Sequence, residues 1–96
     1  MVRLGHAAGT VSGAVETTSN VVRAAIQIIG KSDDAQIISS CFLMYPKSTR
    51  PMVFSDCGLV INPDADELAS IAVMAAQSCK DLLQIEPNVA LSLIHI

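Results

Sequence analysis

The chain has 96 residues, of which 51% are hydrophobic, 16% charged and 3% aromatic, so it corresponds to one domain or to part of one. This apolar content excludes intrinsic disorder. Six Lys and Arg residues against nine Asp and Glu residues give a net charge of −3 without a basic cluster, which argues against a nucleic-acid surface. No apolar run approaches the roughly 20 residues of a membrane span, and no signal peptide is recognisable, so we expect a cytoplasmic protein.

The three cysteines, Cys41, Cys57 and Cys79, are widely spaced and form no CxxC pair. This arrangement supports neither a disulfide framework nor a zinc site. Apolar neighbours predict that Cys41 and Cys79 are small buried thiols. Cys57 follows Asp56 and precedes a glycine, which places it near the end of a strand.

The first third of the chain is expected to contain a strand followed by a helix. Residues 1–8 are typical of the end of a helix, and residues 10–15 of a short buried strand that turns at Gly13. Apolar residues then recur on one face of a predicted helix from about residue 18 to residue 29, which Gly30 ends. Its N-cap candidates are Thr17, Thr18 and Ser19.

The middle of the chain predicts an antiparallel hairpin. Residues 36–45 are almost continuously apolar, which favours a strand buried on both faces. A second strand is expected at residues 52–56. The intervening loop, residues 46–51, is too short for a parallel crossover, so the two strands must run antiparallel.

A second helix and a last strand follow. Asp64 and Glu67 have the spacing of a capping box, and apolar residues repeat with helical periodicity as far as about residue 85. Residues 88–91 are expected to begin another strand. The order helix end, strand, helix, hairpin, helix and strand predicts an α/β fold with a mixed sheet, as part of a three-layer α/β/α arrangement.

Both ends suggest a longer parent protein. The chain stops just inside its last predicted strand, so we expect residues 1–90 to be a partial domain truncated at both ends. Residues 91–96, Leu-Ser-Leu-Ile-His-Ile, match in frame the translation of a sequencing-library adapter. We therefore expect this hexapeptide to be a non-native tail; the alternative is a natural apolar strand.

The best candidate site is the junction between the first strand and the first helix. Free backbone N–H groups at a helix N-terminus favour an anion, and Gly13 permits its close approach. Hydroxyls of Ser12, Thr17 and Thr18 could add hydrogen bonds to phosphate oxygens, and Arg23 could add a charge. The alternative is an ordinary turn with threonine caps, because such strand–glycine–helix junctions are common. Neither a Walker A nor a GxGxxG motif is present, which argues against nucleotide triphosphate and dinucleotide sites of those types.

Asp56 is the second candidate, because it stands at a strand end where loops build sites in α/β folds. A turn-forming role is the alternative. The acidic residues at 64, 66 and 67 resemble a metal cluster by composition, but helix capping explains them. The sequence assembles neither a Ser-His-Asp set nor a Cys-His set, so it reveals no complete active site.

Several collinear blocks together resemble the phosphate acetyltransferase family. These blocks are residues 1–3 (MVR), 9–18 (GTVSGAVETT), 23–29 (RAAIQII), 39–44 (SSCFLM), 53–57 (VFSDC), 62–72 (NPDADELASIA) and 85–90 (IEPNVA). The resemblance implies an enzyme that transfers an acetyl group between coenzyme A and inorganic phosphate. It further implies one lobe of a two-lobed fold of the isocitrate/isopropylmalate-dehydrogenase type, a homodimer, and no metal or cofactor apart from coenzyme A as substrate.

The resemblance also implies residue roles. It places Ser12, Gly13, Ala14, Thr17 and Thr18 along the cleft near the phosphate end of the substrate, and it matches Arg23 and Asp56 to family positions. The sequence departs from the family pattern at Glu16, which would put a negative charge close to an anion, and at Ala24, where a proline often follows the arginine.

The catalytic Ser-Arg pair and carboxylate of the family match nothing in this chain, so no catalytic residue is expected here and the chain alone should be inactive. Two alternatives stay open: part of a phosphate butyryltransferase, or a non-catalytic acyltransferase-like domain of a larger enzyme.

Overall fold

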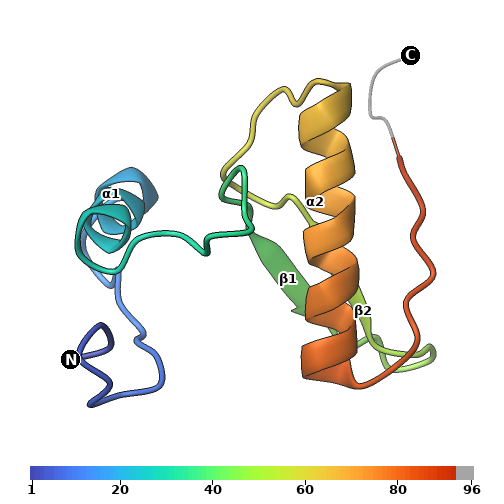
Figure 1. Cartoon of the computed structure of the whole chain (residues 1–96). Coiled ribbons are helices and arrows are strands. Elements are labelled where there is room, and N and C mark those ends of the chain that lie inside the picture. Colours follow the sequence, from blue (N-terminus) through green and yellow to red (C-terminus); the bar gives the residue numbers. More distant parts are fainter. Residues whose placement is uncertain (93–96) are drawn as a thin grey trace. The chain divides into compact units, whose positions relative to one another are not determined.

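The computed structural model describes residues 1–92. The chain divides into two units, Met1–Asp34 and the residues from Ala35 onward, and each is described by itself. The first contains the helix α1 (Thr18–Ile28) and the second contains the strands β1 (Cys41–Met44) and β2 (Met52–Ser55) and the helix α2 (Ala65–Ser78) (Figure 1). The prediction of an α/β chain is confirmed at this level.

Helix α1 begins and ends where the sequence predicts. Thr17 is its N-cap, and the Thr17 Oγ1 accepts a hydrogen bond from the backbone N–H of Asn20 at 3.3 Å. At the other end Gly30 has a φ of +84°, and its N–H donates to the carbonyl of Ala25 at 3.1 Å. The guanidinium of Arg3 donates to the carbonyl of Ile28 at 3.2 Å, which fastens the N-terminal turns to the end of the helix.

The rest of this unit differs from the prediction. Residues 1–8 form turns rather than a helix end, with hydrogen bonds from Gly5 N–H to Val2 and from His6 N–H to Met1. Residues 10–15 do not form the expected strand. A strand needs a neighbour to accept its backbone hydrogen bonds, and residues 1–34 contain no second strand to supply one.

The hairpin of the second unit confirms the predicted antiparallel pairing. Its register places Cys41 opposite Ser55 and Met44 opposite Met52. The first strand is shorter than the predicted 36–45, and the prediction of burial on both faces is wrong, because Phe42 is 58% exposed. An apolar strand is buried on both faces only where layers cover both, and here a helix contacts one.

Helix α2 starts at the predicted capping box. The Asp64 carboxylate accepts from the Glu67 N–H at 2.8 Å, and the Glu67 carboxylate accepts from the Asp64 N–H at 3.5 Å. A π-helical turn, η1 (Cys79–Leu83), continues α2 until Gln84 adopts a left-handed conformation with a φ of +55°.

Ile71 and Cys79 are the buried apolar residues of the described chain, so the core lies under α2.

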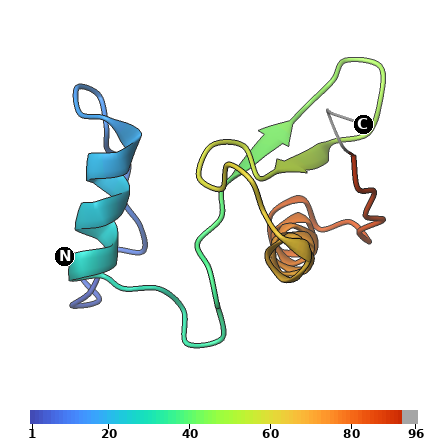
Figure 2. The same cartoon turned by 90° about the horizontal axis from the view of Figure 1, so that it is seen from above.

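The last predicted strand is not formed. Residues 88–92 belong to neither a helix nor a strand, so the sheet of the described residues is two-stranded and antiparallel rather than mixed (Figures 1 and 2). Of the expected non-native tail, only Leu91 and Ser92 are described; residues 93–96 lie outside the described part. Within residues 1–92, no helix is both long and apolar enough to cross a membrane.

Candidate functional site

The predicted anion site coincides with a groove in the first unit. The groove has a volume of about 790 Å³ and lies between the segment at residues 10–16 and one face of α1. Its α1 lining is Asn20, Val21, Ala24, Ala25 and Ile28, followed by Ile29. Gly13 has a φ of +99°, a conformation that favours glycine, and this turn directs the segment along the helix.

The N-terminus of α1 is polar and carries a negative charge. Glu16 precedes the cap residue, and its Oε2 accepts a hydrogen bond from the side-chain Nδ2 of Asn20 at 2.8 Å. The Thr17 hydroxyl accepts from the backbone N–H of Asn20. The carboxylate of Glu16 therefore lies where the helix dipole would attract an external anion.

The structure brings together only some of the predicted binding residues. Ser12, Gly13 and Ala14 line the groove, and Thr17 caps the helix beside it. Arg23 does not line the groove. With 100° between successive helical residues, Arg23 lies on the opposite side of α1 from the groove-lining Val21 and Ala25.

Asp56, the other predicted site residue, is the centre of a hydrogen-bond network in the second unit. Its Oδ1 accepts from the Ser40 hydroxyl at 3.0 Å and from the N–H groups of Gly58 at 2.7 Å and Leu59 at 2.8 Å. Its Oδ2 accepts from the Ser39 hydroxyl at 2.8 Å and the Ser40 N–H at 3.0 Å. The three donors on Ser39 and Ser40 join the turn after β2 to the residues that precede β1, and the two on Gly58 and Leu59 fix the turn itself.

The network extends beyond the carboxylate. The Ser55 hydroxyl donates to the carbonyl of Ser40 at 2.7 Å and lies 3.3 Å from the Ser39 hydroxyl. The Ser40 hydroxyl also accepts from the N–H groups of Cys57 at 3.3 Å and Gly58 at 3.0 Å. The open end of the hairpin is thus closed by side chains rather than by further strand pairing.

This environment favours the charged form of Asp56. Burial raises the pKa of the carboxyl, but hydrogen bonds from Leu59, Ser39, Ser40 and Gly58 outweigh it and hold the pKa well below its usual range. A carboxylate has about four lone-pair positions, and five protein donors occupy them. Asp56 is therefore committed to the fold, in agreement with the turn-forming alternative.

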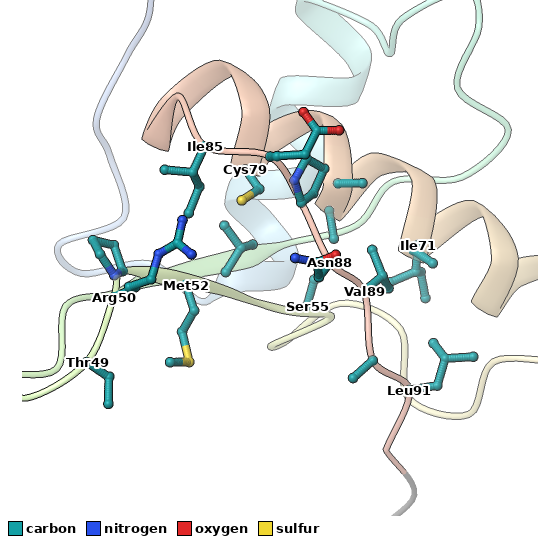
Figure 3. A pocket seen from close by; sticks show the side chains of 18 of the residues that line it. Thr49, Arg50, Met52, Ser55, Ile71, Cys79, Ile85, Asn88, Val89 and Leu91 are labelled. Carbon is teal, nitrogen blue, oxygen red and sulfur yellow. The ribbon is translucent and has the colours of Figure 1, made fainter.

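A second groove, of about 550 Å³, lies in this unit between β2, α2 and the segment at residues 85–91. Figure 3 shows Met52 and Ser55 contributed by β2, Ile71 by α2, and Asn88 and Val89 by the extended segment. Most of its lining is aliphatic. Cys79 is buried at this groove, as predicted, whereas Cys41 and Cys57 are half-buried; all three are free thiols.

Neither groove contains a recognisable metal centre. Within the described residues, no group of three or more His, Cys, Asp or Glu side chains is arranged to hold a metal ion. The chemistry that the first groove offers is hydrogen bonding from hydroxyls and backbone amides, next to an aliphatic helix face.

Comparison with known proteins decides the family. The family model described as phosphate acetyl/butaryl transferase matches residues 1–93. The chain belongs to this family.

Curated relatives agree with the family match. The chain is 59% identical to a phosphate acetyltransferase of Paracoccus denitrificans over 97 residues, which cover 94% of this chain and 30% of that protein. It is 41% identical to a phosphate acetyltransferase of Acetivibrio thermocellus, covering 95% of this chain and 29% of the relative. A phosphate acetyltransferase of Synechocystis is 44% identical, covering 95% of this chain and 13% of that protein. The comparison with solved structures gave no match.

This member of the phosphate acetyl/butaryl transferase family thus spans at most about a third of the length of the relatives it matches.

The predicted site residues fall into two units: Ser12 to Arg23 belong to the first, and Asp56 belongs to the second. Sequence reasoning missed the serines at 39, 40 and 55 that hold Asp56. The hairpin register could have indicated them, because continuing the pairing of Cys41 with Ser55 by one residue brings Ser40 opposite Asp56.

Proposed function

We propose that this chain forms part of a cytoplasmic phosphate acetyltransferase, which transfers an acetyl group between coenzyme A and inorganic phosphate. The observation that carries the proposal is the family match over residues 1–93, together with the named activity of the relatives. The groove beside α1 supports it, because its Ser12–Ala14 wall lies beside the N-terminus of a capped helix.

In the proposed reaction the thiolate of coenzyme A attacks the carbonyl carbon of acetyl phosphate. A carbon–sulfur bond forms, the bond between the carbonyl carbon and the phosphate oxygen breaks, and phosphate leaves with that electron pair. A carboxylate outside these 96 residues accepts the thiol proton. The role proposed for this chain is to bind the phosphate: the Ser12 hydroxyl, the backbone amides at Gly13 and Ala14, and hydroxyls of Thr17 and Thr18 would donate to its oxygens.

Arg23 and Asp56 complete the proposed set in different ways. Arg23 would supply positive charge to the bound anion, although it lies on the side of α1 away from the groove lining. Asp56 would act by holding the turn at residues 57–59 rather than by contacting substrate, because protein donors occupy its carboxylate.

We further propose the larger architecture in which these parts work. The chain would be part of one lobe of a two-lobed, three-layer α/β/α enzyme, acting as a homodimer in acetate metabolism without a metal or a cofactor other than its coenzyme A substrate. A relative that is about three times longer than this chain provides the material for the missing layers. Residues 91–96 would not belong to that enzyme.

A chimera tests the proposal. The chimera is the Paracoccus denitrificans phosphate acetyltransferase in which this chain's aligned residues replace the matching segment. Because the two sequences are 59% identical, we expect the chimera to form acetyl phosphate from acetyl-CoA and phosphate. The isolated 96-residue chain should show no turnover.

Single substitutions in the chimera then test the binding residues. Ser12→Ala should raise the KM for phosphate several-fold. Arg23→Gln, on the side of α1 away from the groove, should raise it by a smaller factor that shrinks as salt is added. Lys47→Gln, in the hairpin loop, should leave it unchanged. A folded chimera without turnover would contradict the proposal and favour the non-catalytic alternative.

Phosphate butyryltransferase is the second candidate, because the matching family model covers both acyl groups. The chimera cannot distinguish them by itself, since acyl specificity could come from the Paracoccus portion. The full-length parent of this sequence, assayed with acetyl-CoA and butyryl-CoA, separates the two: a higher kcat/KM for acetyl-CoA supports the leading proposal.

A further inference from the structure

The groove beside α1 contains one charged side chain. Among the described residues that line it, Glu16 is the only acid or base; the other polar side chains belong to Thr10, Ser12 and Asn20, and the rest of the lining is glycine or aliphatic. A carboxylate repels any anion that enters the groove unless the two make a compensating bond. The position of Glu16 therefore bears on which anions the groove accepts.

Asn20 holds the Glu16 side chain in place. The Asn20 Nδ2 donates to the Glu16 Oε2 at 2.8 Å, and the backbone N–H of the same residue donates to the Thr17 Oγ1 at 3.3 Å. Within residues 1–92, no donor contacts the other carboxylate oxygen, Oε1. One oxygen of Glu16 is thus fixed by the protein, and the other is left for a donor that enters the groove.

The remaining polar groups of the groove are suited to donate. The Ser12 hydroxyl and the backbone amides at Gly13 and Ala14 lie along one wall. The Thr17 oxygen already accepts from Asn20, so the proton of this hydroxyl remains available for an acceptor in the groove. The groove therefore offers several donors together with a single anionic acceptor.

This combination is complementary to an oxyanion that itself carries a proton. At neutral pH inorganic phosphate retains at least one P–OH group, whereas sulfate, of nearly the same size and shape, retains none. An ionised carboxylate can only accept hydrogen bonds, and a bond from O–H to a carboxylate oxygen is short and strong. Phosphate can make this bond to Glu16, but sulfate meets the carboxylate without a proton to share.

We propose that Glu16 determines anion specificity: it accepts a hydrogen bond from the P–OH of phosphate and rejects oxyanions that have no proton to donate. Asn20 is its positioning residue. The inference rests on the proposed function, because the anion is the phosphate of that reaction. Specificity of this kind is a difference of affinities, produced here by a favourable bond to one anion and an uncompensated repulsion of the other.

A bound metal ion accounts for the carboxylate less well. A cation at Glu16 would need further oxygen, nitrogen or sulfur ligands. Within the described residues, no three His, Cys, Asp or Glu side chains are grouped to hold one. The single bond from an amide and the free Oε1 are instead what an acceptor for one O–H group requires.

Calorimetric titration of the chimera with sodium phosphate and with sodium sulfate, at equal ionic strength, tests the inference without a need for turnover. The dissociation constant for sulfate should exceed that for phosphate by at least about ten-fold, the effect of one hydrogen bond to a charged group. Glu16→Gln should reduce this ratio to about three-fold or less. The glutamine oxygen can stay on Asn20 Nδ2, so that its NH₂ group becomes a donor in place of the acceptor.

The change should act mainly on sulfate. In Glu16→Gln the dissociation constant for sulfate should fall at least about ten-fold, whereas that for phosphate should fall only a few-fold, because phosphate loses its bond to the carboxylate along with the repulsion. Asn20→Ala should reduce the ratio only in part, since the charge remains but its position is no longer held. Asp66→Asn, which removes a carboxylate from the first turn of α2, is the matched control and should leave the ratio unchanged.

The outcomes separate this inference from the proposed function. A chimera that turns over, and whose preference for phosphate is the same in Glu16→Gln, would overturn the inference and leave the proposed function in place. An unmodified chimera that binds sulfate as tightly as phosphate would also overturn it. A chimera that shows no turnover but loses its preference for phosphate in Glu16→Gln would contradict the proposed function and support the inference.

Discussion

Asp56 binds Ser40 through both of its carboxylate oxygens. The Ser40 hydroxyl donates to Oδ1 at 3.0 Å, and the Ser40 N–H donates to Oδ2 at 3.0 Å. Since Ser40 precedes β1 and Asp56 follows β2, these bonds continue the hairpin beyond its last strand pair. A carboxylate suits this position because each of its two oxygens can accept several hydrogen bonds and neither must donate.

Asp56→Asn should destabilise the second unit even though the two side chains have nearly the same shape. Whichever way the amide is placed, its NH₂ group replaces an oxygen that accepts at least two protein donors. We expect a loss of about 0.5–1.5 kcal/mol, the net contribution of a typical hydrogen bond, because the donors that lose their acceptor are half-buried or exposed and can bind water instead. Urea unfolding of the full chain followed by circular dichroism measures it.

Asp66→Asn is the matched control for this substitution. Asp66 lies exposed in the first turn of α2, so the change there should cost only a few tenths of a kcal/mol through the helix dipole. Equal urea midpoints for the two variants would show that the Asp56 network contributes nothing to stability.

The same network predicts a dependence of stability on pH. Because the pKa of Asp56 is lower in the folded chain than its unfolded value of about 4, the network stabilises the fold fully above that value. The stabilisation is lost as the pH falls toward the folded pKa. The urea midpoint of the natural sequence should therefore drop more steeply between pH 5 and pH 3 than that of Asp56→Asn. Parallel curves for the two proteins would contradict the assignment.

Gly13→Ala tests the turn that forms the wall of the first groove. The added Cβ would lie 3.4 Å from the Val21 Cγ2, an ordinary contact, so the cost comes from the φ of +99° rather than from lack of space. We expect about 1–2 kcal/mol of strain, the cost of a left-handed conformation for a residue with a side chain. In the chimera, the KM for phosphate should rise several-fold.

Gly9→Ala is the control for the turn, because a Cβ at that position meets no atom within 4 Å and the backbone φ there is not in the left-handed region. If both alanine variants of the chimera keep the KM of the parent, the Gly13 turn has no part in phosphate binding.

Local sequence signals were reliable where the structure depends on neighbouring residues. The Thr17 cap, the Asp64–Glu67 capping box and the short hairpin loop each act within a few residues, and each is present as predicted. The strands predicted at 10–15 and 88–91 are absent, because a strand depends on a partner that the described chain does not supply. The apolar pattern of those segments indicates burial but does not specify the partner.

In the candidate site, too, the sequence predicts what depends on neighbouring residues and does not predict what depends on tertiary structure. Ser12 and Gly13 could be selected from the strand–glycine–helix pattern, which is local. The position of Arg23 could not be predicted in this way. Helical periodicity places Arg23 away from the groove only once the residues that line the groove are known, and these depend on how the segment at 10–16 folds back along α1. The binding partners of Asp56 depend on strand register, which hydrophobicity alone leaves open.

Glu16→Gln should improve phosphate binding by the chimera. The Glu16 carboxylate lines the groove at the N-terminus of α1, where it repels an incoming phosphate, and glutamine removes the charge while keeping an oxygen that accepts from Asn20 Nδ2. We expect the KM for phosphate to fall about two- to five-fold at low ionic strength, and the difference to shrink as salt is added.

The chain provides a matched control in Asp81, whose Oδ1 accepts from Gln77 Nε2 at 2.8 Å four residues earlier. This carboxylate–amide pair has the same bond length and helical spacing as the pair of Glu16 and Asn20, but it lies at the end of α2 in the second unit. Asp81→Asn should leave the KM for phosphate unchanged. An unchanged or higher KM in Glu16→Gln, with turnover intact, would show that the phosphate does not approach the N-terminus of α1.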